Sequence, residues 1–311
     1  MVAATRIPPQ AYFVVSAVFH YLGPAFAVLL FARVDALGVA WLRIATAAAI
    51  FALWRRPWRL LAQLDGDGRR LLLAWGAVLA VMNACFYLAI DRLPLATVAA
   101  IEFLPVIALA AFGVRSACNA AALVLATLGV YLLTGPRFAG EAVAVALAFA
   151  NAGLFALYIV LGHRVSRLHG MGGIDGLAGS MLVAAVVATP MAGWAAVPAL
   201  LDPAALAAGA GVGIASSVIP YVCDQLAMAR LARATYALLV ALLPATATVV
   251  GIVVLAQLPS LAESAGVALV VTGVALHRGE ARAPRRRALV VPGAAVSQRG
   301  RPSLRCVRGS R

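Results

Sequence analysis

Long apolar runs, each about the length of one membrane-spanning helix, occupy most of the chain. A bilayer core about 30 Å thick needs roughly 20 apolar residues for each helical span. The periodic polar face that a helix on the surface of a soluble protein needs is missing from nearly all of these runs. We therefore predict an all-α polytopic membrane protein rather than a large soluble helical protein. Ten spans are predicted, at residues 11–32, 36–54, 71–90, 95–113, 119–134, 142–162, 176–197, 204–229, 234–256 and 262–278.

Composition supports the membrane prediction. Hydrophobic residues make up 64% of the 311 residues and charged residues only 12%, with a mean hydropathy of +0.98. A soluble domain is roughly half apolar and a quarter charged, so these values exclude an ordinary soluble enzyme or binding domain.

The positive charges predict the orientation. All 25 basic residues are arginine, and ten spans put both termini on one side. Before the C-terminal tail, that side holds eleven arginines, including five between Arg55 and Arg70, whereas the other side holds only Arg33, Arg92 and Arg137. The positive-inside rule therefore predicts cytoplasmic termini in the inner membrane. The first apolar run is too long for a cleavable signal peptide and is interpreted as a signal anchor.

The tail explains most of the net charge of +14. Ten arginines lie between Arg278 and Arg311, among Pro, Gly, Ser and Ala. We expect residues 279–311 to form a disordered cytoplasmic tail, with attraction to anionic lipid as an alternative. No aromatic or fold signal supports nucleic-acid binding. The four cysteines have no metal or redox spacing, and we expect no metal and no organic cofactor.

An internal repeat predicts the architecture. Cys85–Ala99 aligns with Cys223–Ala237 at an offset of 138, with eight of fifteen positions identical, and Pro105 matches Pro244 with one residue of slippage. The chain then divides into two halves of five helices, and an odd number of spans makes the second half enter from the opposite side. Inverted repeats of this kind are typical of secondary transporters, whose substrate site lies near the midplane between the halves.

These halves set the expected domain boundaries. Residues 1–10 are the cytoplasmic N-terminus, 11–134 the first repeat and 142–278 the second.

Three ionisable residues fall within predicted spans: Arg43, Glu102 and Asp224. A charge at mid-bilayer is unfavourable by several kcal/mol unless it is paired or faces a cavity, so each is a candidate functional residue. Pro105 removes the hydrogen bond to the Ile101 carbonyl and makes a polar position beside Glu102. Glu102 is interpreted as a proton carrier, the alternative being a permanent ion pair with Arg43 that only fixes the packing.

Asp224 and Arg43 each have two interpretations. Asp224 follows Pro220, which also loosens the helix, and Gln225 adds a second polar group. Asp224 is thus either a second proton-handling group or a structural one. Arg43 either extends to the membrane interface or faces inward and holds a carboxylate through its bidentate guanidinium.

Weaker candidates complete the predicted site. Several polar side chains could bind a zwitterionic solute or, alternatively, a neighbouring helix: Asn83, Tyr87, Asn151, Tyr158 and Tyr221. Three prolines are expected to break helices: Pro105, Pro220 and Pro244. The zinc-protease, serine-hydrolase and Walker motifs are missing, so we predict neither an enzyme nor an ATP-driven pump.

The motifs resemble those of the EamA-type transporters of the drug/metabolite transporter superfamily, above all the threonine/homoserine exporter branch. The matching segments are Gly38–Arg43, Arg56–Leu60, Asn83–Ile90, Pro94–Pro105, Ala156–Arg164 and Ile219–Asp224. The resemblance implies a ten-helix inverted-repeat fold and proton-driven export of amino acids or related metabolites.

The chain departs from that branch at several positions. Leu243 stands before Pro244 where the branch has Glu, and Gln257 replaces an acid after the ninth span. Tyr21 and Val28 replace a Gln and a Lys of the first helix. These departures put the exact substrate in question more than membership of the family.

The expected function is export of a small amino acid or related metabolite by proton antiport. The expected partners are the small-molecule substrate, protons and the lipid bilayer, and a homodimer stays open. An exporter of a drug-like cation or a nucleoside is the alternative within the same class. A membrane scaffold without transport is the alternative from another class.

Overall fold

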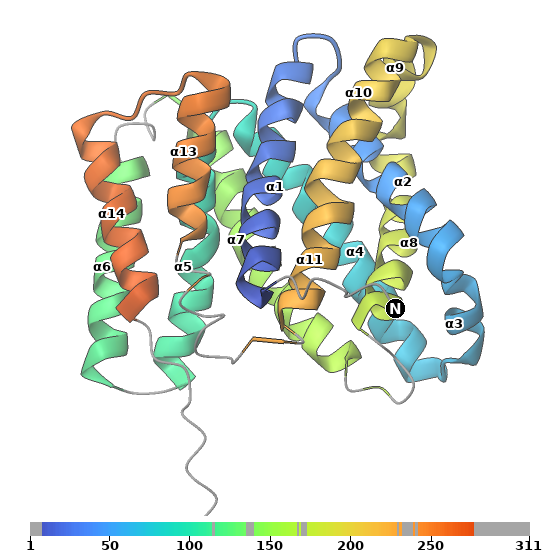
Figure 1. Cartoon of the computed structure of the whole chain (residues 1–311), viewed down its shortest axis with the longest axis horizontal. Helices are drawn as coiled ribbons and strands as arrows, with labels where there is room; N and C mark the ends of the chain where they lie inside the picture. Colours follow the sequence, from blue (N-terminus) through green and yellow to red (C-terminus); the bar gives the residue numbers. More distant parts are fainter. Residues whose placement is uncertain are drawn as a thin grey trace, which may run out of the picture. The chain divides into compact units, whose positions relative to one another are not determined.

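The computed structural model describes residues 8–113, 116–134, 140–166, 168, 173–228, 230–231, 239 and 242–276, which form helices and no strand (Figure 1). The helices of the first predicted half are α1 (Pro9–Leu30), α2 (Ala36–Arg55), α3 (Pro57–Gln63), α4 (Gly66–Ile90), α5 (Leu95–Gly113) and α6 (Ala117–Thr134). Those of the second are α7 (Ala142–Val165), α8 (Gly173–Ala192), η2 (Gly193–Ala196), α9 (Val197–Leu201), α10 (Pro203–Gly213), η3 (Ile214–Val218), α11 (Ile219–Met228), α13 (Leu243–Leu255) and α14 (Leu261–Leu276). The predicted tail lies outside the described residues.

Within the described part of the chain, seven helical segments are long and apolar enough to cross a bilayer, among them Gly173–Leu201 and Pro203–Asp224. Three shorter apolar helices begin at Leu95, Leu243 and Leu261, where the remaining spans are predicted. The all-helical membrane class is therefore confirmed, and the count of ten spans stays a prediction.

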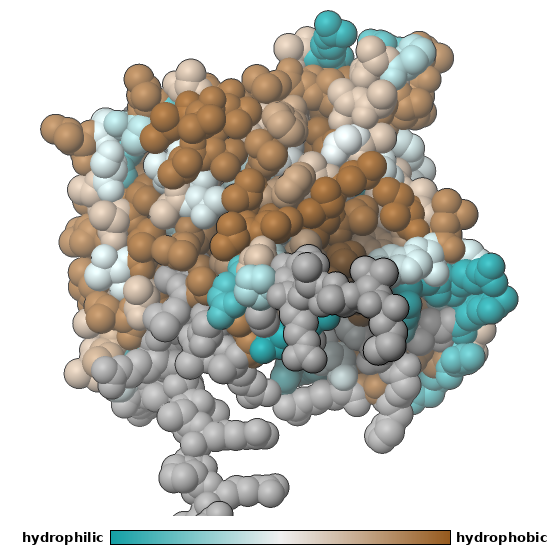
Figure 2. Space-filling view, viewed as in Figure 1, coloured by the Kyte–Doolittle hydropathy of each residue, from teal (hydrophilic) through white to brown (hydrophobic). Residues whose placement is uncertain are grey.

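Apolar side chains cover much of the outside of the described helices, as the brown surface in Figure 2 shows. Leu53 and Val124 are more than half exposed, and so are Trp54 and Trp58. The two tryptophans lie near the junction of α2 and α3, next to Arg55 and Arg56. Tryptophan and arginine together are typical of the membrane–water interface, so this junction is expected to lie at headgroup level.

Helices of the two predicted halves pack against each other throughout. The most extensive contacts are α6 with α14, α4 with α7, and α8 with both α2 and α4, followed by α1 with α11. Figure 1 shows α6, α14, α5 and α13 together on one side and α2, α8 and α10 on the other. The halves therefore interleave instead of forming separate lobes.

Small residues bring these helices close together. Gly129 of α6 and Gly266 of α14 face each other, so that a Cβ on Gly129 would lie 2.6 Å from the Gly266 carbonyl oxygen. Gly76 of α4 meets Val183 of α8 in the same way. Close approach of backbones at small residues is the main source of helix association in lipid, where no hydrophobic effect drives the helices together.

The predicted helix break at Pro105 is corrected, whereas the break at Pro244 is not tested, because residues 240 and 241 lie outside the described part of the chain. Pro105 lies inside α5, which continues to Gly113, because a membrane helix can lose one backbone hydrogen bond when neighbouring helices re-satisfy the freed groups. Pro244 lies in the first turn of α13, where its missing N–H is not needed. Pro220 follows a π-helical turn, so the predicted span 204–229 consists of α10, η3 and α11.

We expect Gly129→Leu to lower the unfolding temperature of the detergent-solubilised protein by several degrees. Overpacking typically destabilises a protein by about 1–3 kcal/mol, and the α6–α14 contact has no room for the added side chain. Gly153→Leu is the control, since a Cβ on Gly153 meets no atom within 4 Å. Equal unfolding temperatures of both variants, measured by a thermal assay, would contradict the close-packing account.

Candidate functional site

Arg43 and Glu102 are the two charged side chains that lie buried among the described residues, each 6% exposed. Each follows the first residue of its helix by seven positions, Ala36 in α2 and Leu95 in α5. A rise of 1.5 Å per residue puts both about 10 Å into their helices. Because α1 and α4 end where α2 and α5 begin, both charges lie at a similar depth from one end of the bundle.

Arg43 reaches across to the second half. Its Nε donates to Ser217 Oγ at 2.8 Å and its Nη2 donates to the Ser216 carbonyl at 3.0 Å. Its guanidinium carbon also lies 5.5 Å from the centre of the Tyr87 ring, within the range of a cation–π interaction. The predicted inward orientation of Arg43 is thus observed, and the alternative of extension to the interface is not.

The local backbone explains why acceptors are available there. In an α-helix the N–H of residue 220 would donate to the Ser216 carbonyl, but Pro220 has no N–H. In the π-turn of η3 the N–H of Ile219 donates to the Ile214 carbonyl, five residues earlier, and not to the carbonyl four residues earlier as in an α-helix. The Ser216 carbonyl is left for Arg43, and the Pro220 carbonyl accepts from Ser16 Oγ of α1 at 3.1 Å.

Glu102 also bonds to the second half. Its Oε1 accepts from Asn151 Nδ2 of α7 at 3.3 Å. No oxygen of Glu102 lies within 4.0 Å of an Arg43 nitrogen, so the structure does not contain the permanent ion pair that was one interpretation of the sequence. The two charges are nevertheless close enough to interact electrostatically.

Three buried polar atoms near these charges have no hydrogen-bond partner among the described residues. They are Tyr21 Oη, Tyr87 Oη and Asn151 Oδ1. Tyr21 interacts electrostatically with Glu102, and the guanidinium of Arg43 lies over the Tyr87 ring. Buried polar groups are normally satisfied by protein, water or ligand, so these atoms mark a place where a polar solute or ordered water can bind.

A second group of polar residues extends toward the other end of the bundle. Tyr158, Tyr221 and Asp224 are half-buried, and Tyr158 interacts electrostatically with the other two. Tyr221 also interacts electrostatically with Arg43 and Glu102, so it lies between the Arg43–Glu102 group and the group of Tyr158 and Asp224. Asp224 lies four residues before the end of α11 and is therefore separated from the depth at which Glu102 lies.

Comparison with known proteins identifies the family. The threonine/homoserine exporters RhtA of Escherichia coli (strain K12) and of Salmonella typhimurium (strain LT2) are each 33% identical to the chain over 238 residues, which is 76% of this chain and 79% of theirs. The chain belongs to the RhtA-like family of exporters. No family model matches the chain.

A solved crystal structure supports the fold alone. It covers 87% of this chain and 98% of its own, with a TM-score of 0.54 and 20% sequence identity. The relatives named RhtA are exporters, so the chain is a multi-pass membrane transporter of the RhtA-like family.

Other predicted residues have different surroundings. Asn83 Nδ2 donates to the Leu79 carbonyl of its own helix at 2.8 Å, so one of its donors is used within α4. Tyr158 packs between Trp75 and Phe155, with ring centres 5.3 and 6.5 Å away. Gln225 lies in α11, but its side chain is outside the described residues.

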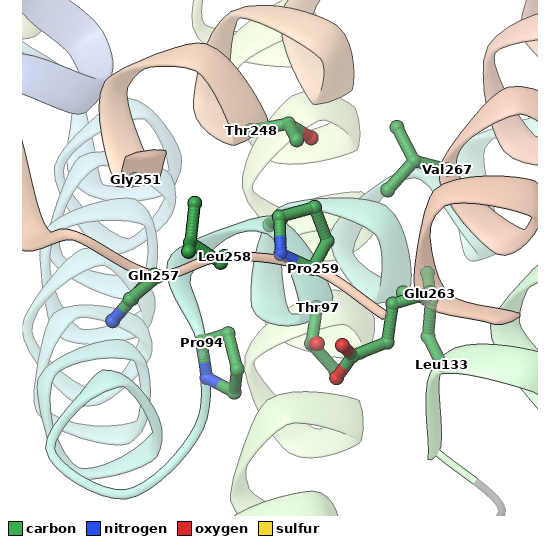
Figure 3. A pocket seen from close by; sticks show the side chains of 11 residues that line it. Pro94, Thr97, Leu133, Thr248, Gly251, Gln257, Leu258, Pro259, Glu263 and Val267 are labelled. Atoms are coloured by element: carbon green, nitrogen blue, oxygen red, sulfur yellow. The ribbon is translucent and has the colours of Figure 1, made fainter. Parts of the chain in front are cut away.

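A cavity of about 240 Å³ lies away from these residues. It is lined by α5, α6, α13 and α14, and includes Thr97, Thr248, Gln257 and Glu263 (Figure 3). None of the predicted site residues lines it. Gln257 Oε1 accepts from the Leu95 N–H at 3.1 Å, so the glutamine that replaces an acid of the exporter branch joins the connection between α13 and α14 to the first residue of α5.

Sequence reasoning did not select Ser216, Ser217 or Tyr21 as site residues. The signal for the two serines was their position directly before Val218, Ile219 and Pro220, since a proline at residue 220 frees the carbonyl of residue 216. The sequence marked Tyr21 only as the residue that replaces a glutamine of the exporter branch, and its place near Glu102 depends on the packing of α1.

We expect Arg43→Met to destabilise the protein by about 2–4 kcal/mol in the absence of substrate. The change leaves the Ser216 carbonyl and the Ser217 hydroxyl buried without their donor, and each unsatisfied group is unfavourable by about 1–3 kcal/mol. Arg33→Met, at an exposed position, is the control and should leave stability within about 0.5 kcal/mol. Thermal or denaturant unfolding in detergent measures the difference, and equal stability of both variants would contradict the role of Arg43 in joining the halves.

Proposed function

We propose that this RhtA-like protein exports a small amino acid across the cytoplasmic membrane by proton antiport. In this proposal the two five-helix halves rock against each other and expose a central site first to one side and then to the other. The inner membrane and cytoplasmic termini follow from the arginine distribution. The inner-membrane location agrees with relatives that are exporters of Escherichia coli and Salmonella.

One observation carries the proposal: both buried charges bond across the interface between the halves. Arg43 of the first half bonds to Ser216 and Ser217 of the second, and Glu102 of the first bonds to Asn151 of the second. A rocking motion must break or rearrange such contacts, and protonation or substrate binding can bias them. Charged groups inside a membrane bundle typically mark such pathways.

The packing supports an inverted repeat of two halves. Gly76 packs on Val183 and Gly213 packs on Thr46. Residues 76 and 213 are 137 apart, and so are 46 and 183, so each contact becomes the other when the halves are exchanged. Gly129 and Gly266, also 137 apart, meet each other. Pairs of this kind are expected around a two-fold axis that relates the halves.

The central groups suit a zwitterion. Arg43 can bind a carboxylate, while Glu102 and Asn151 Oδ1 can accept from an ammonium group. The hydroxyls of Tyr21 and Tyr87 are left for a small polar side chain. The relatives are named as threonine/homoserine exporters, and a hydroxyl-bearing amino acid fits this set of donors and acceptors.

Glu102 is the proposed proton carrier. Burial favours the protonated carboxyl, whereas the nearby Arg43 and the Asn151 amide favour the carboxylate. A carboxyl subject to both effects can change its protonation when the surroundings change. We propose Asp224, which lies nearer the expected cytoplasmic end, as a second proton-handling group that exchanges with water.

An organic cation is a second candidate substrate. Trp75, Tyr158 and Phe155 form a row of rings, and Tyr158 interacts with Asp224. Aromatic faces beside a carboxylate bind quaternary or aromatic cations. Competition of proton-coupled threonine transport by a cationic dye in liposomes distinguishes the two substrates.

We expect Glu102→Gln in proteoliposomes to remove the pH dependence of threonine and homoserine export and to lower the proton-driven rate at least tenfold. The neutral amide keeps the shape but cannot exchange a proton. Transport is measured as counterflow and as pH-gradient-driven flux, with folding checked by size-exclusion chromatography.

Glu141→Gln is the matched control, because it removes the same charge at the N-cap of α7, where the Glu141 side chain makes no capping hydrogen bond. Normal pH dependence in a folded Glu102→Gln protein would refute the proton role. Flux that stays unchanged in every variant, together with altered complex formation, would favour a scaffold.

A further inference from the structure

The segment of the second half that binds Arg43, made of α10, η3 and α11, contains one residue more than its counterpart in the first half, α4. Gly76 of α4 and Gly213 of α10 occupy equivalent places, since their contacts exchange with the halves. From Gly76 to Cys85 the chain advances nine residues, whereas from Gly213 to Cys223, the aligned pair, it advances ten. The extra residue falls where η3, the π-helical turn Ile214–Val218, interrupts the α-helix.

Single-residue insertions into α-helices produce π-turns, which frequently occur at functional sites. Here the π-turn and Pro220 together present a hydroxyl and a free carbonyl to the interior. The counterparts of Ser216 and Ser217 at an offset of 137 are Leu79 and Ala80 in the regular helix α4. The acceptors therefore exist in only one half.

Arg43 is equally unmatched. Its counterpart at the same offset is Ser180, whose hydroxyl donates to the Leu177 carbonyl of its own helix at 2.9 Å. The packing around both positions keeps the repeat, but the anchored guanidinium occurs once. Such a single polar connection in an otherwise related pair of helix contacts indicates a role beyond holding the helices together.

The chemistry of the acceptors defines this role. Ser217 Oγ and the Ser216 carbonyl are neutral, so they fix the plane of the guanidinium without neutralising its charge. No oxygen of Glu102 comes within 4.0 Å of an Arg43 nitrogen. Of the five N–H groups of an arginine, two are committed to the serines, which leaves others for an incoming anion. A carboxylate binds a guanidinium more strongly than a hydroxyl or carbonyl does.

We propose that Ser217 and the Ser216 carbonyl are positioning groups that hold Arg43 ready for the carboxylate of the substrate. The π-turn and Pro220 are the backbone features that make this anchor possible. The inference rests on the proposed amino-acid export and adds to it the specific groups that orient the carboxylate.

Ser217→Ala tests the proposal in proteoliposomes. We expect the KM for threonine to rise about tenfold with the saturating rate retained, because the loss of one hydrogen bond to a charged group typically changes affinity by that factor. Ser217→Thr restores the hydroxyl and should restore KM. Ser180→Ala is the matched control, since it removes a buried serine hydroxyl from the same half without touching Arg43, and should leave KM within twofold.

Pro220→Ala provides a second variant if Ser217→Ala does not fold. It introduces an N–H that competes for the Ser216 carbonyl, and it should raise KM in the same direction. An unchanged KM with a lower unfolding temperature would show that the anchor is only structural and would overturn the proposal. An equal rise of KM in Ser180→Ala would overturn it as well.

Glu102→Gln in the same preparation separates the two proposals. If it loses pH dependence while Ser217→Ala keeps a normal KM, the positioning role is refuted and proton antiport stands. If Ser217→Ala raises KM while Glu102→Gln keeps a normal pH dependence, the carboxylate anchor stands and the proton role is refuted. A parent protein that carries no amino acid refutes both.

Discussion

A guanidinium in the interior of a membrane protein must be given hydrogen-bond acceptors, and this requirement organises the centre of the molecule. The acceptors of Arg43 lie in η3, directly before α11. Pro220 has no N–H, so it cannot donate the α-helical hydrogen bond to the Ser216 carbonyl. The hydroxyl of Ser16 in α1 donates a hydrogen bond to the Pro220 carbonyl in the same region. Gly23 of α1 lies so close to Ser216 that a Cβ there would collide with it. Backbone irregularity, polar contact and close packing therefore coincide at one level of one helix.

The interleaving of the helices gives these polar contacts a functional meaning. The five most extensive packing contacts each join a helix of one predicted half to a helix of the other, so the interface between the halves runs through much of the bundle. Most of that interface is apolar or lined with small residues, which slide or rock without the loss of hydrogen bonds. The buried exceptions include the contacts of Arg43 and Glu102 and the bond from Ser16 to the Pro220 carbonyl. Two of these three connections carry a charge, so the proposed changes of protonation and substrate would act on the interface between the halves.

The proposed repeat keeps some of its packing contacts but not its chemical groups. The contacts at Gly76 and Gly213 are exchanged when the two predicted halves are exchanged. Arg43, Glu102 and the serines of η3 have no equivalents of their own kind. A substrate with two different charged ends needs two different partners, and a symmetric site would offer the same partner twice. Asymmetric residues on a nearly symmetric scaffold meet this requirement.

The sequence by itself determined the class of fold, because apolar runs of bilayer length and arginine-rich connections follow from the free energy of transfer alone. It also singled out Arg43 and Glu102, since a charge within such a run is unfavourable wherever the helix is packed. The repeat of Cys85–Ala99 in Cys223–Ala237 was also visible, because identical residues at a constant offset can be recognised without knowledge of the packing.

Only the tertiary structure decided what these charges meet. Whether Arg43 bonds to Glu102 or to the serines depends on how α2 rotates against η3, and distant packing sets that rotation. The excess residue between Gly213 and Cys223 is present in the sequence. A one-residue insertion can become a π-turn, a loop or a shift of register, and packing against α1 and α2 decided among them. Tyr21 was noted in the sequence only as a replacement for a glutamine of the exporter branch, and its place near Glu102 followed only from the packing of α1 against α11 and α13.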